Sequence, residues 1–278
     1  VSGNAGDHRC LQYLRGVLCL LHCALYCPGP GRRVCPGAVS THSPAQLPDL
    51  PAFFTAHYYE TITSTNDVAR DKARAGAPAG NLIVAGEQRA GRGRTGREWT
   101  SKPGNLYMSL LLRPPGHAGE VAQISFLAAQ ALSDAILQIA PNLEPQHKWP
   151  NDVLIGGAKI SGILLESAAR AGGGVEWLVL GMGVNVAPHP QDAGQSTTSL
   201  HTLGIRKSTP HSLLAALAPR LLHWLDVWQQ QGFAPLRMAW LQRAQKLNEQ
   251  IRVRVGGEEF VATFRDLDGN GNLIVELP

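Results

Sequence analysis

The sequence predicts an α+β fold in which a β-sheet and several helices share one core. Short apolar runs rich in β-branched residues, such as NLIVAGEQ at 81–88 and EWLVLGMGVNV at 176–186, are typical of buried strands. Residues 121–140 instead repeat apolar side chains at intervals of three and four, which predicts a long amphipathic helix. The chain has 278 residues, of which 44% are hydrophobic, and this is enough for one large core with a small satellite domain.

The first half of the folded region predicts three strands and one helix. STNDVARDKARAG at 64–76 predicts a helix that ends at Gly76, and its Ser64 and Asp67 have the S-x-x-D spacing of a capping box. Pro114 is expected to end the third strand because proline cannot donate to a β-ladder. The predicted strands are HYYETI (57–62), NLIVAGEQ (81–88) and LYMSLLLRP (106–114).

The second half begins with a predicted hairpin. Two β-rich runs within 152–168 flank Gly156-Gly157, the two-residue signal of a tight turn. Residues 212–245 predict two helices separated near Gly232. From Asn248 onward the chain alternates around a second Gly-Gly pair, which predicts three short antiparallel strands that begin a small β-barrel and stop before it closes.

The N-terminal segment differs from the rest of the chain. All five cysteines fall within the first 35 residues, around the apolar stretch GVLCLLHCALYC. A secretory signal, an organellar transit peptide and an unfolded extension remain open as interpretations. No run approaches the roughly 18 apolar residues that span a bilayer, so we expect no membrane segment. The cysteine-free body suits a reducing compartment, and the expected location is cytoplasmic.

The overall charge limits the classes of ligand. The net charge of +4 and the pI near 8.9 permit an anionic ligand. They fall short of the strong positive field expected of a dedicated nucleic-acid-binding protein.

The stretch AGRGRTGREW at 90–99 combines three glycines with three arginines. Gly91, Gly93 and Gly96 match the dinucleotide pattern G-x-G-x-x-G, but no apolar helical period follows Gly96, so a Rossmann turn is rejected. No Walker P-loop pattern exists, and an RNA clamp would need interleaved aromatic residues. The remaining hypothesis is a flexible loop whose guanidiniums pair with phosphate or carboxylate; the alternative is a solvated basic loop.

A second candidate cluster lies in KWPNDVLIGGAKISGILLES at 148–167. Lys159 stands on an otherwise apolar strand, where a lysine is either a ligand-binding group or an edge residue with its amine in water. Pro150 breaks regular structure, so that Asn151 and Asp152 are able to face a ligand or a Mg²⁺ ion. GMGVNV at 181–186 places Asn185 at the end of a strand, a common position for ligand contacts.

Together these segments resemble the biotin–protein ligases, also called biotin–acetyl-CoA-carboxylase ligases. The resemblance spans roughly residues 55–278 in the same order and spacing. Its specificity comes from the joint presence of the Gly/Arg stretch, KWPND and the downstream lysine. The matching motifs are STND (64–67), EQRAGRGRTGREW (87–99), GNLYMSLLLRP (104–114), KWPNDVLIGGAKISGILLE (148–166) and GMGVNV (181–186).

The resemblance implies a fold and a reaction. The fold is a mixed β-sheet with helices on one face, of the class II synthetase-like biotin/lipoate ligase type, followed by an SH3-like barrel that here looks truncated. The implied domains are a disordered extension at 1–52, a catalytic domain at 53–247 and an incomplete C-terminal domain at 248–278. The enzyme would use ATP and Mg²⁺ to form biotinyl-5′-AMP, and would then transfer biotin to a lysine of the biotin carboxyl carrier protein.

The resemblance also assigns roles to individual residues. Lys159 and Arg92 would be catalytic, with Lys159 binding first the biotin carboxylate and then the adenylate phosphate, and Asp152 would bind Mg²⁺. The Gly/Arg loop would order over the ligand and shield the mixed anhydride from water. The biotin site would comprise Ser64, Thr65, Asn66, Gln88, Arg92, Gly93, Arg94 and Lys159. The ATP site would comprise Arg94, Asn105, Lys148, Asn151 and Asn185.

Several points of function stay open at this level. Residues 1–50 show no pair of amphipathic helices joined by a turn, so we expect a ligase that binds no operator DNA. Homodimerisation through an exposed sheet edge is one option. Lipoate–protein ligase, a nucleic-acid-binding regulator and an inactive biotin-binding module are the competing interpretations.

Overall fold

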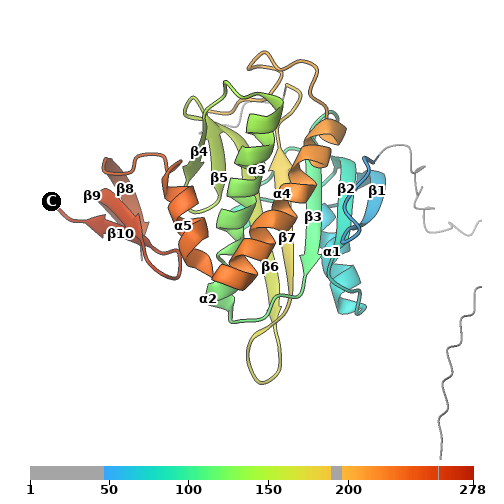
Figure 1. The fold of residues 1–278 in the computed structure, drawn as a ribbon, viewed down its shortest axis with the longest axis horizontal. Coiled ribbons are helices and arrows are strands. Elements are labelled where there is room, and N and C mark those ends of the chain that lie inside the picture. Colours follow the sequence, from blue (N-terminus) through green and yellow to red (C-terminus); the bar gives the residue numbers. More distant parts are fainter. Residues whose placement is uncertain (1–46, 189–195, 256) are drawn as a thin grey trace, which may run out of the picture. The chain divides into compact units, whose positions relative to one another are not determined.

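A computed structural model of the chain describes residues 47–188, 196–255 and 257–278, and contains one large mixed sheet (Figure 1). The strand order is β1-β2-β3-β7-β6-β5-β4, in which β1 and β2 run parallel and every other neighbouring pair is antiparallel. This confirms the α+β class and the mixed sheet. The strands are β1 (Thr55–Ile62), β2 (Asn81–Gln88), β3 (Leu106–Leu112), β4 (Pro145–Lys148), β5 (Asp152–Ile155), β6 (Ala158–Ala169) and β7 (Val175–Val184).

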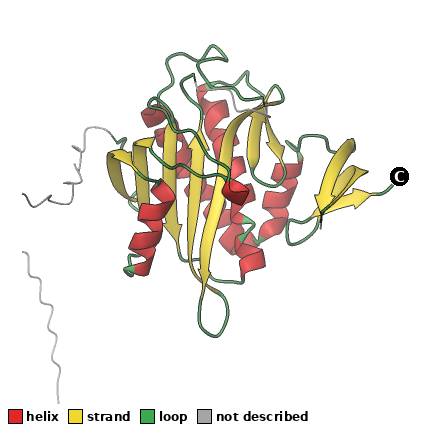
Figure 2. Cartoon of the chain, turned by 180° about the vertical axis from the view of Figure 1, so that it is seen from behind, coloured by secondary structure: helices red, strands yellow, loops and turns green. Residues whose placement is uncertain are grey.

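The main helices lie on both faces of this sheet (Figures 1 and 2). The long helices α3 (Ile124–Ile139) and α4 (Pro210–Gln231) pack on the face that carries Leu82, Leu110 and Leu180. Helix α1 (Thr65–Arg74) packs on the opposite face, against Ile83, Leu111 and Val179. Placement of the helices on one face therefore holds for α3 and α4 and fails for α1, because the buried residues of β2, β3 and β7 alternate between two apolar faces.

Helix α3 departs from the predicted amphipathic pattern. It begins at Ile124, after the short helix α2 (Ala118–Val121), and Ser125, Gln130 and Ser133 are buried along with its apolar residues. The helix is covered by the sheet on one side and by α4 on the other, so almost no face remains for water. As expected, α4 and α5 (Phe233–Leu241) are separated at Gly232, whose positive φ of 74° suits glycine.

Two local predictions at the edges of elements need correction. Ser64 is the N-cap residue of α1 but makes no side-chain cap, and Asp67 turns instead to Arg70 and Arg92. The capping box therefore does not form. Strand β4 was missed because its four residues, PQHK, start with proline and lack an apolar alternation.

The predicted hairpin between β5 and β6 is confirmed. Gly156 and Gly157 have φ values of 58° and 76°, the left-handed conformation at both central positions that a type I′ turn requires. The turn places Lys159 in β6 next to β5, where Leu154 is its partner in the ladder. The hairpin thus fixes where the lysine side chain leaves the sheet.

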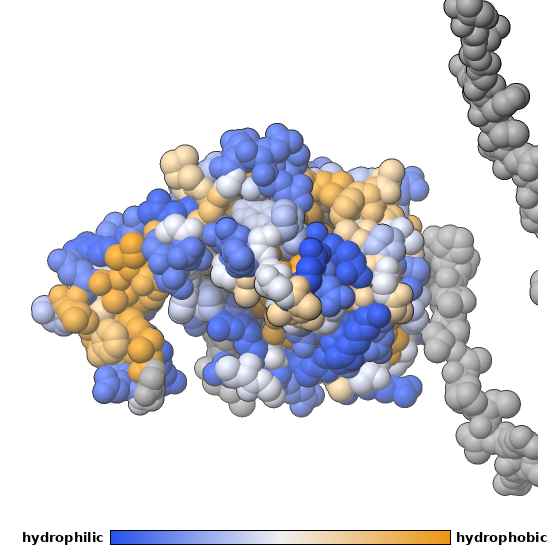
Figure 3. Space-filling model, turned by 90° about the horizontal axis from the view of Figure 1, so that it is seen from below, coloured by the Kyte–Doolittle hydropathy of each residue, from blue (hydrophilic) through white to orange (hydrophobic). Residues whose placement is uncertain are grey.

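The C-terminal residues form a separate three-stranded antiparallel sheet in the order β10-β9-β8. Apolar side chains gather on this sheet (Figure 3), and Val255 and Leu277 are each 65% exposed. The sheet is tied to the larger domain by hydrogen bonds that the side chains of Gln123, Trp149 and Arg237 donate to its backbone carbonyls. Its strands are β8 (Gln250–Val255), β9 (Glu258–Leu267) and β10 (Leu273–Glu276).

None of the helices in the described part of the chain is long and apolar enough to cross a membrane. The predictions for the cysteine-rich segment fall outside the described residues. The expectation of no helix-turn-helix, made for residues 1–50, falls almost wholly outside them.

His147 anchors β4 in the core. Its ring nitrogens contact Ser133 Oγ at 2.9 Å and the Trp240 carbonyl oxygen at 3.2 Å, and the side chain is fully buried. Burial lowers the pKa of His147 to about 3, from an ordinary value of 6.5. The folded protein therefore keeps His147 neutral where the unfolded chain protonates it.

This difference predicts a pH-dependent stability. As the pH falls from 6.5 towards 3, His147 binds a proton in the unfolded state but not in the folded state. The free energy of unfolding therefore decreases across that pH range. In the wild type, His147 should lower the free energy of unfolding by about 2–3 kcal/mol when the pH falls from 6.5 to 4.5. His147→Gln has no titrating group at this position and should not show that decrease. Urea titrations at both pH values measure it. The exposed His211→Gln should behave as the wild type, and an unchanged pH dependence in His147→Gln would contradict the assignment.

Candidate active site

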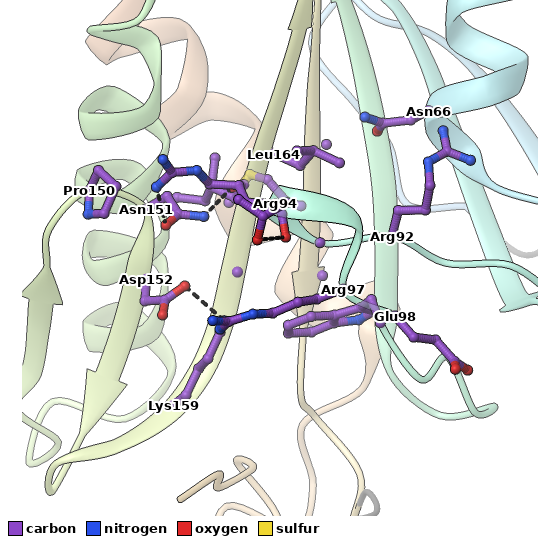
Figure 4. A pocket seen from close by; sticks show the side chains of 18 of the residues that line it. Asn66, Arg92, Arg94, Arg97, Glu98, Pro150, Asn151, Asp152, Lys159 and Leu164 are labelled. Atoms are coloured by element: carbon purple, nitrogen blue, oxygen red, sulfur yellow. Dashed lines mark hydrogen bonds and ion pairs between the residues drawn. The ribbon is translucent and has the colours of Figure 1, made fainter. Parts of the chain in front are cut away.

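A polar cavity of about 370 Å³ lies on the α1 face of the sheet, between the start of α1, the Gly/Arg loop (residues 90–99) and the turn from β4 to β5 (Figure 4). Its lining unites segments that are far apart in the sequence. Among the lining residues are all eight of the predicted biotin-site residues: Ser64, Thr65, Asn66, Gln88, Arg92, Gly93, Arg94 and Lys159. The predicted ATP or metal residues Lys148, Asn151 and Asp152 line it as well.

The wall at the start of α1 is held by a buried polar network. Gln88 Oε1 accepts hydrogen bonds from the Thr65 backbone N–H at 2.8 Å and from the Thr65 hydroxyl at 3.1 Å. The Ser109 hydroxyl, fully buried on β3, lies within hydrogen-bonding distance of Thr65 Oγ1 and Asn66 Oδ1. Since Gln88 also donates to Ser101 Oγ, it joins α1, β2 and the end of the Gly/Arg loop.

Arg92 does not point into the cavity but extends along its edge towards α1 (Figure 4). Its two terminal nitrogens donate to both oxygens of the Asp67 carboxylate, at 3.0 and 2.7 Å. The hydrogen bonds from Arg92 hold the pKa of Asp67 below its usual range, and Asp67 in turn raises the pKa of Arg92. The pair is thus charged throughout the neutral range.

Arg94 reaches the opposite wall. Its Nη1 donates to Asn151 Oδ1 at 3.2 Å, and the Asn151 amide is itself fixed by a bond to the Ile163 carbonyl oxygen. The loop doubles back on itself, because the Gly93 N–H donates to the Arg97 carbonyl oxygen and the Trp99 N–H donates to the Gly91 carbonyl oxygen. Only a three-residue 3₁₀ turn (Arg94–Gly96) follows, which agrees with the rejection of a Rossmann helix.

Lys159 and Asp152 meet at the base of the cavity. Lys159 Nζ lies 2.8 Å from Asp152 Oδ1, and the two side chains are only 15% and 14% exposed. The indole of Trp99 lies beside them, with Lys159 Nζ 5.3 Å from the ring centroid. The lysine is therefore a fixed, largely desolvated cation. This argues against the alternative that Lys159 is an edge residue with its amine in water.

Trp99 is a cavity residue that the sequence did not single out. A Cβ atom on Gly183 would come within 2.5 Å of its indole ring, and one on Gly162 within 2.9 Å. In the same way, a Cβ on Gly181 would meet the Asn66 amide at 2.2 Å. Glycine at these strand positions could have signalled a close approach, but not which side chain approaches.

Asn105 and Asn185 lie outside the cavity lining and hold backbone instead. Asn105 Oδ1 accepts from the N–H groups of Val186 and Ala187, and Asn185 Nδ2 donates to the Thr198 carbonyl oxygen. Both side chains are buried. They hold backbone near Lys159, whose own N–H donates to the Ser196 carbonyl oxygen and whose carbonyl oxygen accepts from the Thr198 N–H.

No preformed metal centre occurs among residues 47–188, 196–255 and 257–278, because no three His, Cys, Asp or Glu side chains cluster there. Asp152 offers a single carboxylate, and the amide-bearing Asn151 lines the same cavity. That donor set fits a Mg²⁺ ion that keeps its waters and is held mainly by substrate phosphates.

The comparisons with known proteins place this geometry in a family. The family model described as "Biotin/lipoate A/B protein ligase family" matches residues 50–242, and "Biotin protein ligase C terminal domain" matches residues 246–278. The chain belongs to the biotin/lipoate A/B protein ligase family. A biotin–[acetyl-CoA-carboxylase] ligase of Paracoccus denitrificans is 41% identical over 77% of this chain and 91% of its own length. One of Mycobacterium tuberculosis is 33% identical over 77% of this chain and 80% of its own.

Solved structures of the family share the fold. A Leishmania major biotin protein ligase in complex with biotinyl-5-AMP is 30% identical with a TM-score of 0.59, covering 79% of this chain and 94% of that one. An Aquifex aeolicus biotin protein ligase in complex with biotin and ATP has a TM-score of 0.69 at 24% identity, covering 79% and 90%.

The packing of Trp99 on Gly183 yields a prediction. Gly183→Ala should destabilise the fold by about 1–3 kcal/mol, because the added methyl group overpacks the indole. In a Trp99→Ala background the same substitution should cost far less, and the non-additivity can be measured by urea titration of all four proteins. Gly119→Ala, where a Cβ meets open space, is the control. Additive effects would mean that Trp99 does not rest on Gly183.

Proposed function

We propose that this chain is an ATP-dependent biotin–protein ligase that forms biotinyl-5′-AMP and transfers biotin to a lysine of the biotin carboxyl carrier protein. The observation that carries the proposal is the cavity itself, which is lined by the largely desolvated Lys159 and by the arginine-bearing loop. The names of the relatives in Paracoccus and Mycobacterium support the same activity.

The first step joins two anions and therefore needs positive charge more than a base. A carboxylate oxygen of biotin attacks the α-phosphorus of ATP, the bond to the β-phosphate oxygen breaks, and pyrophosphate leaves. Lys159 would hold the carboxylate and then the new phosphate ester, while Arg94 and Lys148 would face the phosphates. A Mg²⁺ ion, bound by Asp152 and the phosphates, would neutralise the leaving pyrophosphate.

In the second step the carrier lysine amine attacks the acyl carbon of the mixed anhydride, and AMP leaves with the electron pair of the broken C–O bond. The acyl-adenylate must be kept from water until then. The Gly/Arg loop spans the cavity from Asp67 to Asn151, as such a cover requires.

The biotin end of the cavity is assigned to the α1 wall. Ser64, Thr65 and Asn66 would supply polar contacts to the ureido group, and Gln88 would act mainly by holding Thr65 in place. The side chains of Asn105 and Asn185 already hydrogen-bond to backbone groups of Val186 and Thr198. They would therefore contribute to the nucleotide site only by positioning these backbone segments.

Further parts of the proposal concern the whole protein. We assign catalysis to residues 53–247 and a docking or closing role to 248–278, and place the reaction in the cytoplasm. A homodimer would have the edge strand β1 available, whereas the edge of β4 is already paired at His147 with Arg243 and Gln245.

The decisive experiment is incubation with biotin, Mg-ATP and a carrier domain, followed by mass spectrometry of the carrier. Addition of one biotinyl group to a single carrier lysine is the expected result. Modification with lipoate and not biotin would reassign the chain to lipoate ligation. Biotin binding without AMP formation would make it an inactive module.

Lys159→Gln tests the catalytic assignment. The amide is polar but carries no charge, so biotin-dependent pyrophosphate exchange should fall by roughly a hundredfold or more. The exposed Lys207→Gln serves as the matched control. Exchange at the wild-type rate in Lys159→Gln would remove this lysine from the reaction.

A further inference from the structure

The Gly/Arg loop is fastened to its two walls by contacts of very different strength. At its base, Arg92 makes a bidentate pair with Asp67 of α1 and lies 3.7 Å from Glu166 of β6, and the three side chains are between 21% and 35% exposed. Two parallel hydrogen bonds between opposite charges, shielded in part from water, make this the strong attachment.

The tip of the loop has a weaker hold. Arg94 makes a single hydrogen bond to the neutral Asn151 amide, and Arg94, Thr95, Gly96 and Arg97 are all exposed. Thr95 adopts φ 56°, a left-handed conformation that is unfavourable for a β-branched residue. The tip is thus the part of the loop that is released at lowest cost.

Asp67 is oriented for the role of an anchor. It stands in the first turn of α1, where the expected capping box does not form, so its carboxylate is free to face the loop. Arg70 donates to the same Asp67 Oδ1 from one turn further along the helix, at 2.5 Å. Glu166, the second acid, is held by the Asn66 amide at 2.8 Å. Both acids are therefore in place before the loop closes.

We propose that Asp67 is a positioning residue that clamps the base of the Gly/Arg loop through Arg92, so that the loop opens only at its tip, on the Asn151 side of the cavity. This inference rests on the proposed function for its consequence, retention of the acyl-adenylate, but the clamp itself is a property of the ligand-free protein. Arg92 is then a positioning residue rather than a contact of the reacting atoms.

The clamp constrains how the reaction is completed. With the base held on α1, the side of the cavity that carries the α1 wall stays covered when the tip lifts. The carrier lysine therefore enters over the turn from β4 to β5, past Asn151. A loop released at both ends would instead expose the whole acyl-adenylate to water and to unrelated amines.

Limited proteolysis of the full chain without ligands tests the clamp. Trypsin must take up an extended segment on both sides of the cut, so cleavage after Arg94 or Arg97 requires the base of the loop to leave the surface as well as the tip. The cleavage rate at these two sites, resolved by mass spectrometry, therefore reports release of the base. Asp67→Asn and Arg92→Gln should each raise that rate by roughly fivefold to tenfold. The double variant should be cleaved no faster than either single variant, because both remove one interaction.

The controls separate the clamp from damage to α1. Arg70→Gln removes the other partner of Asp67 and leaves the loop contact intact, so cleavage should stay at or below the wild-type rate. Asp71→Asn changes an exposed acid on the same helix and should match the wild type. Cleavage of Asp67→Asn at the wild-type rate, or multiplicative effects in the double variant, would overturn the proposal.

A second readout tests the consequence during turnover. In the wild type, AMP formed and biotin delivered to the carrier should agree at about one to one, because the intermediate is retained. Asp67→Asn should form AMP in excess and place more biotin on an added bystander protein. If its loop is cleaved faster while the ratio stays at about one, the clamp does not serve retention and that part is wrong. Absence of AMP in the wild type would instead contradict the proposed function, and the proteolysis result would still test the clamp.

Discussion

Three glycines at the centre of the sheet make the cavity possible. Gly181 and Gly183 on β7 continue the face on which Trp177 and Val179 pack against α1, and Gly162 on β6 is the ladder partner of Gly183. Without their side chains, Trp99 and Asn66 approach the strand backbone more closely than any Cβ would permit. The position of the Gly/Arg loop follows, because Trp99 is its last anchor on the sheet.

This arrangement divides one face of the sheet into two functional halves. One half is covered by helix α1, which makes apolar contacts to the strands through residues such as Ala69 and Ala73. The other half is the cavity, to which the N-terminal turn of α1 supplies the polar groups of Thr65 and Asn66. Gln88 and Ser109 hold these two residues in fixed orientations. Because buried polar groups are costly when unpaired, this network holds the cavity wall in one arrangement.

The opposite rim is tied to the C-terminal sheet. Trp149 directly precedes the Pro150 turn, and its indole N–H donates to the Gly271 carbonyl oxygen at 3.0 Å. Gly271, with φ 85°, lies against Phe126 at the start of α3, where a Cβ would come within 2.7 Å of the ring. The loop between β9 and β10 thus braces the residues that lead to Asn151, so that the C-terminal sheet and the cavity are mechanically connected.

The sequence alone located most of the elements and indicated the family. Periodicity and turn signals located six of the seven strands of the large sheet, because burial imposes its period directly on the residues. The joint motifs also indicated the family, and the comparisons confirmed it. The tertiary structure decided what each polar group faces. The predicted capping box at Ser64 does not form, because Asp67 pairs with Arg92 instead. Arg92 in turn points towards α1 and not into the cavity that its motif suggested. Asn105 and Asn185 hydrogen-bond to backbone groups instead of lining the cavity. Trp99 lines the cavity and Glu166 lies beside Arg92, although the sequence singled out neither residue. Such pairings join residues up to about a hundred positions apart, so no local pattern encodes them.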